Sequence, residues 1–165
     1  MNQRPTIRRA EAHEAQRLSD VAFLSKAYWG YSPEFMAACR RELTFTPAEL
    51  RDNHFFVAEV DGNVVGFYGL TPLAPSEIEL EALFVEPAYI GQGYGRALMD
   101  HAKSTAKNLG AAALIIQGDP HAAPFYQAAG GQLTGQRESA SIPGRYLPTF
   151  VIPLTSHYRH TVLSD

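Results

Sequence analysis

Apolar residues recur at intervals of three and four in the first third of the chain and alternate with polar residues in the middle third. The first spacing predicts helices, and the second predicts strands buried on one face. Ser32 and Thr46 each precede a proline, a pattern typical of a helix N-cap. Asp61-Gly62 separates two alternating runs and predicts a two-residue hairpin turn. These signals predict a strand at 5–10, helices at 11–29 and 33–43, a helical turn at 46–50 and a hairpin at 54–73.

The strand predicted at residues 77–87 alternates acidic and apolar side chains. Glu79 and Glu81 are expected on one face of this strand, because successive side chains point to opposite faces. The other face is expected to carry the apolar side chains of Ile78, Leu80, Ala82 and Phe84.

A strand–helix–strand unit follows from the next segments. A helical pattern ends at Gly110, and residues 111–117 are apolar on both faces, as in a buried parallel strand. Asp119 is positioned to cap a short helix, and Pro143-Gly144 marks a type II turn. The last strands are predicted at 132–140 and 148–154, so the sheet is expected to be mixed.

Composition excludes several classes of protein. The 165 residues are 45% hydrophobic and 19% charged, which predicts one globular domain spanning 1–165. A net charge of −3 argues against a nucleic-acid partner, and no apolar run reaches the length of a membrane span or a signal peptide. Cys39 is the single cysteine and the histidines lack ligand spacing, so we expect no metal. A cytoplasmic location fits these features.

The stretch "YIGQGYGRAL" at residues 89–98 places three glycines just before a predicted helix. Side chains are absent where backbone N–H groups at the helix start are unpaired, which favours a bound phosphate or diphosphate. The dinucleotide pattern fails because Arg96 stands where the third glycine belongs, and the Walker pattern fails because no Lys-Ser/Thr follows.

The spacing instead resembles that of a known family. "LFVEPAYIGQGYGRAL" resembles the acyl-CoA-binding motif of the GNAT acetyltransferase superfamily, and "DPHAAPFYQAAGG" resembles its later Phe-Tyr motif. The predicted order of elements is similar over nearly the whole chain. The resemblance implies an α/β (α+β) fold, a central mixed sheet of about seven strands flanked by about four helices. Two positions depart from the motifs: Ile90 stands where Gln or Arg is usual, and His121 where Asn is frequent.

The resemblance also implies roles for named residues. The enzyme would transfer acetyl from acetyl-CoA to a primary amine, with Glu79 or Glu81 as base and Tyr126 as acid toward the thiolate. The backbone N–H of Val85 would face the thioester carbonyl. Arg145 could bind a carboxylate, and the aromatic residues Tyr28, Trp29 and Tyr31 would border the acceptor. Acetyl-CoA would contact Phe84, Val85, Gly91, Gln92, Gly93, Tyr94, Gly95, Arg96, His121 and Phe125.

Three alternatives stay open at this level. The acceptor is an amine of a small molecule or of a protein, and either glutamate is the base. A non-catalytic acyl-CoA sensor would share the glycine turn without using Tyr126 or the glutamates. A homodimer is a further expectation, because dimers are common in the family.

Overall fold

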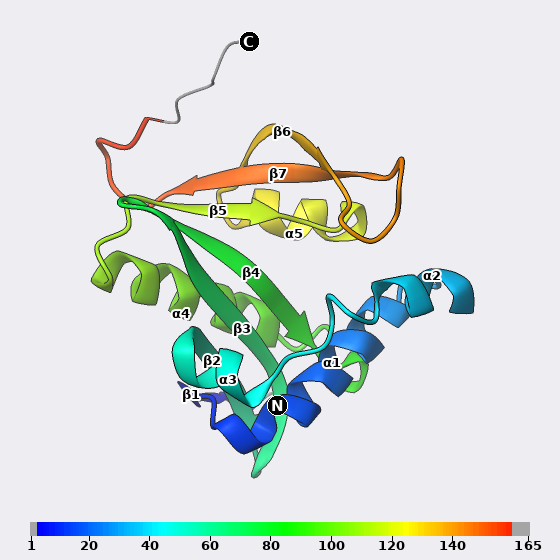
Figure 1. Cartoon of the computed structure of the whole chain (residues 1–165). Coiled ribbons are helices and arrows are strands. Elements are labelled where there is room, and N and C mark those ends of the chain that lie inside the picture. Colours follow the sequence, from blue (N-terminus) through cyan, green and yellow to red (C-terminus); the bar gives the residue numbers. More distant parts are fainter. Residues whose placement is uncertain (1–2, 160–165) are drawn as a thin grey trace.

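Seven strands form one sheet in the order β1-β2-β3-β4-β5-β7-β6 in the computed structural model, which describes residues 3–159 (Figure 1). All neighbouring strands are antiparallel except β4 and β5, which are parallel. The expected mixed sheet is therefore confirmed. The strands are β1 (Thr6–Arg9), β2 (His54–Val60), β3 (Asn63–Ala74), β4 (Glu77–Val85), β5 (Ala113–Gln117), β6 (Gln132–Glu138) and β7 (Tyr146–Pro153).

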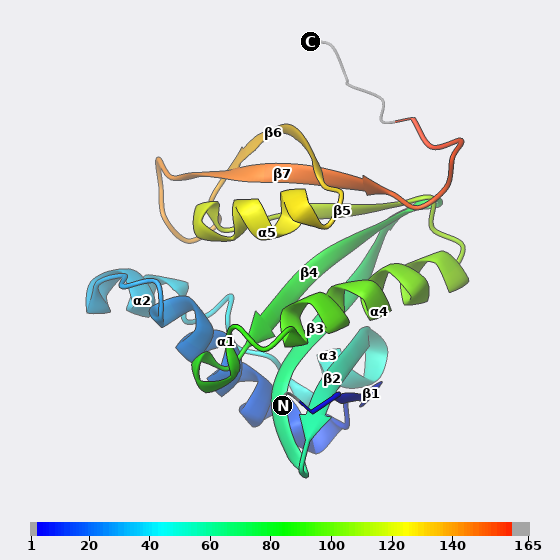
Figure 2. The ribbon, with the colours of Figure 1, turned by 180° about the vertical axis from the view of Figure 1, so that it is seen from behind.

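Helices cover both faces of the sheet (Figures 1 and 2). One buried cluster packs the first three helices against β2 and β3, and a second packs α4 and α5 against the opposite face. The described residues hold five α-helices where about four were expected, because the turn at Thr46 extends into the short helix α3. The α-helices are α1 (Ala15–Ala27), α2 (Pro33–Cys39), α3 (Pro47–Asp52), α4 (Tyr94–Asn108) and α5 (Ala123–Ala128); short 3₁₀ turns are η1 (Ala12–Glu14), η2 (Pro87–Tyr89) and η3 (Pro120–Ala122).

The predicted caps and turns are confirmed by hydrogen bonds and dihedral angles. The hydroxyls of Ser32 and Thr46 accept backbone N–H groups at 3.1 and 3.2 Å, and Asp119 accepts the His121 N–H at 2.8 Å. Asp61 and Gly62 have φ of +52° and +79°, as a primed two-residue hairpin turn requires. Local sequence therefore fixes where these elements begin.

The expectation that Ile78, Leu80, Ala82 and Phe84 share one face of β4 is wrong. Gly69 pairs with Ala82 and Leu70 with Leu80, so Glu81 is an extra residue that forms a bulge. The bulge reverses the alternation after Leu80: Ile78 and Leu80 pack on the α4 side, whereas Ala82 and Phe84 pack on the α1 side. A bulge of this kind re-aims the side chain that it carries.

The parallel pair β4 and β5 is short and then opens. Residues 77–79 of β4 pair with residues 113–115 of β5, and beyond them the strands diverge (Figure 1). At the far end of β4, the Glu86 N–H donates to the Val65 carbonyl at 2.8 Å. Because N–H directions alternate along an antiparallel strand, the Val85 N–H faces away from β3, toward the open edge.

Candidate active site

The glycine turn leaves open space in front of α4. Gly91 and Gly93 have φ of +83° and +86°, and a β-carbon built on either would meet no atom within 4 Å. Gly93 is the left-handed N-cap of α4, a conformation that other residues adopt at a cost of about 1–2 kcal/mol. The N–H groups of the first helical turn, residues 94–96, have no intrahelical acceptor. This end of α4 therefore presents unpaired N–H groups and partial positive charge.

The other residues expected to hold the donor lie around this turn in different ways. The Tyr94 side chain is buried in the core beside Tyr89, so only its backbone N–H faces the turn. Gln92 is partly buried, and Arg96 is exposed on the first turn of α4. Arg96 and Phe125 line a hollow of about 330 Å³ between α4 and α5.

Phe84 does not fit its expected main-chain role. Phe84 lies opposite Phe67, two residues before Glu86, whose N–H donates to Val65 of β3. Because every second residue of an antiparallel strand bonds to the same neighbour, the N–H and carbonyl of Phe84 also point to β3. The Phe84 side chain lies on the α1 side and lines the cavity described next. Of the two residues expected to pair with the pantetheine arm, only Val85 presents its main chain to the open edge.

A cavity of about 300 Å³ lies beside the opening between β4 and β5, on the α1 side of the sheet. Its walls come from β4, from the end of α1, from the segment between α2 and α3, and from the residues after β5. Its lining includes Glu79 and Glu81, together with the other β4 residues up to Phe84. Further lining residues are Lys26, Trp29, Glu42, Phe84, Asp119, Tyr126, Ala140 and Leu147.

Glu81 differs from Glu79 in its surroundings. The Thr71 hydroxyl donates to Glu81 Oε1 at 2.6 Å. Glu81 is an exposed residue, yet partial desolvation of its carboxyl raises the pKa of that group; the Thr71 hydrogen bond opposes the rise, and repulsion from Glu49 and Glu79 adds to it. A carboxylate with a raised pKa is a stronger base than an ordinary one, which suits proton removal at neutral pH.

Tyr126 is 8% exposed, and its ring packs against Phe150. Its hydroxyl makes no hydrogen bond within residues 3–159, yet no buried side-chain oxygen in that range lacks a partner, so the hydroxyl oxygen is open to solvent. Since Tyr126 lines the cavity, this opening is toward the cavity. Burial and the nearby Asp119 carboxylate raise the pKa of Tyr126 to about 12.

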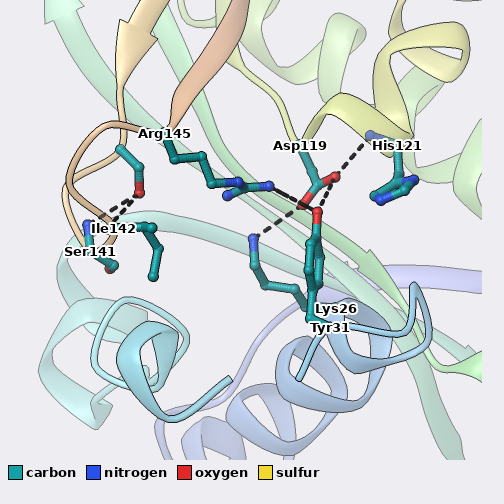
Figure 3. A network of polar contacts seen from close by, with 8 residues as sticks. Lys26, Tyr31, Asp119, His121, Ser141, Ile142 and Arg145 are labelled. Carbon is teal, nitrogen blue, oxygen red and sulfur yellow. Dashed lines mark hydrogen bonds and ion pairs between the residues drawn. The ribbon is translucent and has the colours of Figure 1, made fainter. Parts of the chain in front are cut away.

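Asp119 is the centre of a polar network (Figure 3), two members of which, Asp119 and Lys26, line the cavity. It accepts the Tyr31 hydroxyl at 2.8 Å and contacts Lys26 Nζ and Arg145 Nη2 at 3.3 Å each. Burial acts to raise its pKa, but the His121 N–H, Tyr31 and Lys26 outweigh burial, so the pKa of Asp119 is lowered. The network ties α1, the turn after it and the β6–β7 loop to the segment between β5 and η3.

Arg145 is therefore not free for a substrate carboxylate, contrary to expectation. Besides Asp119, its guanidinium donates to the Tyr31 hydroxyl at 2.8 Å and lies 4.8 Å from the centre of the Phe35 ring. With a carboxylate and two aromatic partners already in place, Arg145 holds the Asp119 network together.

The three aromatic residues expected to border the acceptor lie in different places relative to the cavity. Trp29 lines the cavity and stacks on the His121 ring at 5.0 Å with an interplanar angle of 8°. Tyr28 is 56% exposed and does not line the cavity, and Tyr31 holds Asp119. The His121 ring thus contacts the turn after α1, and the expected contact of His121 with the CoA arm stays a prediction.

Sequence reasoning identified Asp119 only as a helix cap and gave no role to Glu42 or Lys26. Lys26 and Tyr31 lie 93 and 88 residues from Asp119, so no local spacing announces their contact. An acidic residue after a buried strand, with a lysine on a helix that packs nearby, was the available signal.

Within residues 3–159, no group of three or more His, Cys, Asp or Glu side chains is arranged to hold a metal ion. None of the helices in the same range has both the length and the apolar character needed to span a membrane.

The sequence and the fold are both similar to those of known acetyltransferases. The acetyltransferase (GNAT) family profile matches residues 21–130. N-alpha-acetyltransferase RimI from Mycobacterium tuberculosis is 33% identical over 128 residues, 75% of this chain and 76% of that protein. A GCN5-related N-acetyltransferase from Rhodopseudomonas palustris superposes with a TM-score of 0.76 at 23% identity, covering 93% of this chain and 98% of that chain.

A second similar structure contains coenzyme A. PaiA N-acetyltransferase from Thermoplasma acidophilum, in complex with coenzyme A, also gives a TM-score of 0.76, at 20% identity over 92% of this chain and 99% of that chain. The family profile covers more than half of the chain, which confirms the expectation of an acetyl-CoA-dependent N-acetyltransferase. The chain belongs to the GNAT family of acetyltransferases.

Proposed function

We propose that the protein transfers the acetyl group of acetyl-CoA to a primary amine bound in the cavity beside β4. The observation that carries this proposal is the composition of the cavity wall: Glu79, Glu81 and the unpartnered Tyr126 line one space beside the opening between β4 and β5. That opening adjoins the start of α4, so a donor bound there would reach the acceptor.

The residues present fit acetyl-CoA as the donor substrate. The open space at Gly91 and Gly93 and the unpaired N–H groups of residues 94–96 suit a diphosphate, which favours the positive end of a helix. The Val85 N–H at the open edge of β4 would donate to the thioester oxygen and stabilise the negative charge that develops on it.

In the reaction, the amine nitrogen attacks the thioester carbon while the carbon–sulfur bond breaks. An alkyl ammonium has a pKa near 10.4, so it must lose one proton to solvent before the attack, and a base must take a second proton from the nitrogen as the amide forms. We assign this role to Glu81, directly or through a water molecule, because desolvation raises its pKa and the bulge directs its carboxylate to the cavity. The products are the N-acetylated amine and the thiol of CoA.

Tyr126 acts on the departing sulfur. A thiolate has a pKa near 8.5, so full proton transfer from a phenol with a pKa of about 12 is uphill by roughly 5 kcal/mol. Hydrogen bonding from the neutral phenol costs no such transfer and still stabilises the thiolate. Tyr126 is therefore a hydrogen-bond donor to the leaving sulfur, and the thiolate takes its final proton from solvent.

Release of free thiol from acetyl-CoA in the presence of a panel of amines tests the proposal. We expect Glu81→Gln to lower kcat by about 10²-fold, the usual contribution of a general base, and Tyr126→Phe to lower it by about tenfold. Glu79→Gln is the matched control on the same strand and is expected to retain most of kcat.

A different pattern would favour the non-catalytic sensor. Tight binding of CoA, with thiol release that no amine accelerates, would contradict the proposed transferase. Equal losses in Glu79→Gln and Glu81→Gln would contradict the assignment of Glu81 alone.

A further inference from the structure

We infer that the acceptor is a small amine with a second cationic centre, such as a linear diamine. This inference rests on the proposed function and specifies the class of amine that the same cavity accepts. It follows from the charges that line the cavity, from where they lie and from the size of the space.

The cavity carries uncompensated negative charge. Glu42, Glu79 and Glu81 line it, and none of them forms an ion pair with a cation within residues 3–159. Lys26 is the one basic side chain among the lining residues, and its Nζ already contacts Asp119. Arg145 adds a second cation to Asp119, so this group carries one net positive charge against the three glutamates, and the cavity wall stays negative.

These carboxylates come from two different walls. Glu79 and Glu81 belong to β4, next to the opening where the thioester would lie. Glu42 belongs to the segment between α2 and α3. One amine can thus be acetylated beside Glu81 while a second, still protonated, is held by Glu42.

An independent feature marks the same space as a ligand site. The Tyr126 side chain is more than nine-tenths buried, yet its hydroxyl has no partner within residues 3–159 and opens to the cavity. The hydroxyl can therefore form a hydrogen bond with a bound reactant in place of water.

The size of the space favours a small acceptor. A volume of about 300 Å³ is that of roughly ten water molecules in the liquid. Asp119 and Lys26 contribute to its wall, and so do Ala140 and Leu147 from the β6–β7 region. A diamine of a few carbons fits entirely inside, whereas a peptide would enter by its first residue alone.

Comparison of kcat/KM between acceptors that differ in their second charge or in size tests the inference. We expect kcat/KM for 1,4-diaminobutane to exceed that for 1-aminobutane, and that for a neutral tripeptide amide with a free N-terminus, by at least tenfold. Glu42→Gln should lower the diamine-to-monoamine ratio at least fivefold. Glu34→Gln, the same change on an exposed residue of α2 outside the cavity, should leave the ratio unchanged.

Calorimetry provides a readout that does not depend on turnover. In the presence of CoA, 1,4-diaminobutane should bind the wild type more tightly than it binds Glu42→Gln. A diamine-to-monoamine ratio near one, or a clear preference for the tripeptide, would overturn the inference while amine acetylation still stands. Failure of every amine to accelerate thiol release would instead overturn the proposed function, and this inference with it.

Discussion

Glu79 and Glu81 are two positions apart on one strand, yet their environments differ. Both were predictable as candidate bases because they precede the glycine turn on a half-buried strand. The bulge at Glu81 was not predictable, since the local alternation continues unbroken and the extra residue is defined only by pairing with β3. The hydrogen bond from Thr71, a residue of that neighbouring strand, was hidden for the same reason.

The hydrogen bond from Thr71 to Glu81 should affect how kcat/KM depends on pH. Thr71 lowers the pKa of Glu81, so Thr71→Val should raise that pKa. Because the base acts in its ionised form, the acid limb of the profile should then move to higher pH. Thr71→Ser keeps the hydroxyl and should keep the wild-type limb. An unshifted limb in Thr71→Val would argue against Glu81 as the base.

At the scale of elements, the starts of helices were well predicted and the contacts between them were not. A short polar side chain caps the start of a helix at three positions, Ser32, Thr46 and Asp119, and can be recognised from the sequence. The network at Asp119 instead joins α1, the turn after it and the β6–β7 loop to the end of β5. Only the folded sheet brings these segments together, so Arg145 was wrongly expected to be free.

Asp119→Asn should show what the network contributes to stability. Asparagine can still cap η3, so the change mainly removes the charge, and we expect the free energy of unfolding to fall by about 2 kcal/mol at pH 7. The folded-state pKa of Asp119 is lowered, so its contribution is present above the unfolded pKa near 3.9 and is lost as pH falls through the folded pKa.

Urea unfolding at pH 7 and near pH 3 measures this dependence. The difference between wild type and Asp119→Asn should shrink at the lower pH, and Asp52→Asn, an exposed aspartate at the end of α3, should match wild type at both. A difference that stays constant with pH would mean that the charge of Asp119 is not what stabilises the network.

At the scale of the whole molecule, β4 and β5 diverge beyond their short parallel pairing (Figures 1 and 2), and the cavity proposed for the acceptor lies beside that opening. The mixed seven-stranded sheet was predictable because its strand–helix–strand unit is continuous in sequence and the rest is a meander. The walls of the cavity were not, since residues from Ser25 to Leu147 contribute to them. The proposed function depends on acetyl-CoA binding to the backbone N–H groups at the glycine turn before α4.

Calorimetric titration of CoA into two leucine variants tests that anchor most directly. Gly93 and Gly110 lie at opposite ends of α4 with φ of +86° and +93°, and a β-carbon at either meets no atom within 4 Å. Both substitutions therefore cost a similar backbone strain, about 1–2 kcal/mol. We predict that Gly93→Leu, which covers the unpaired N–H groups, weakens CoA binding at least tenfold, while Gly110→Leu binds like wild type. Wild-type affinity in folded Gly93→Leu would contradict the account.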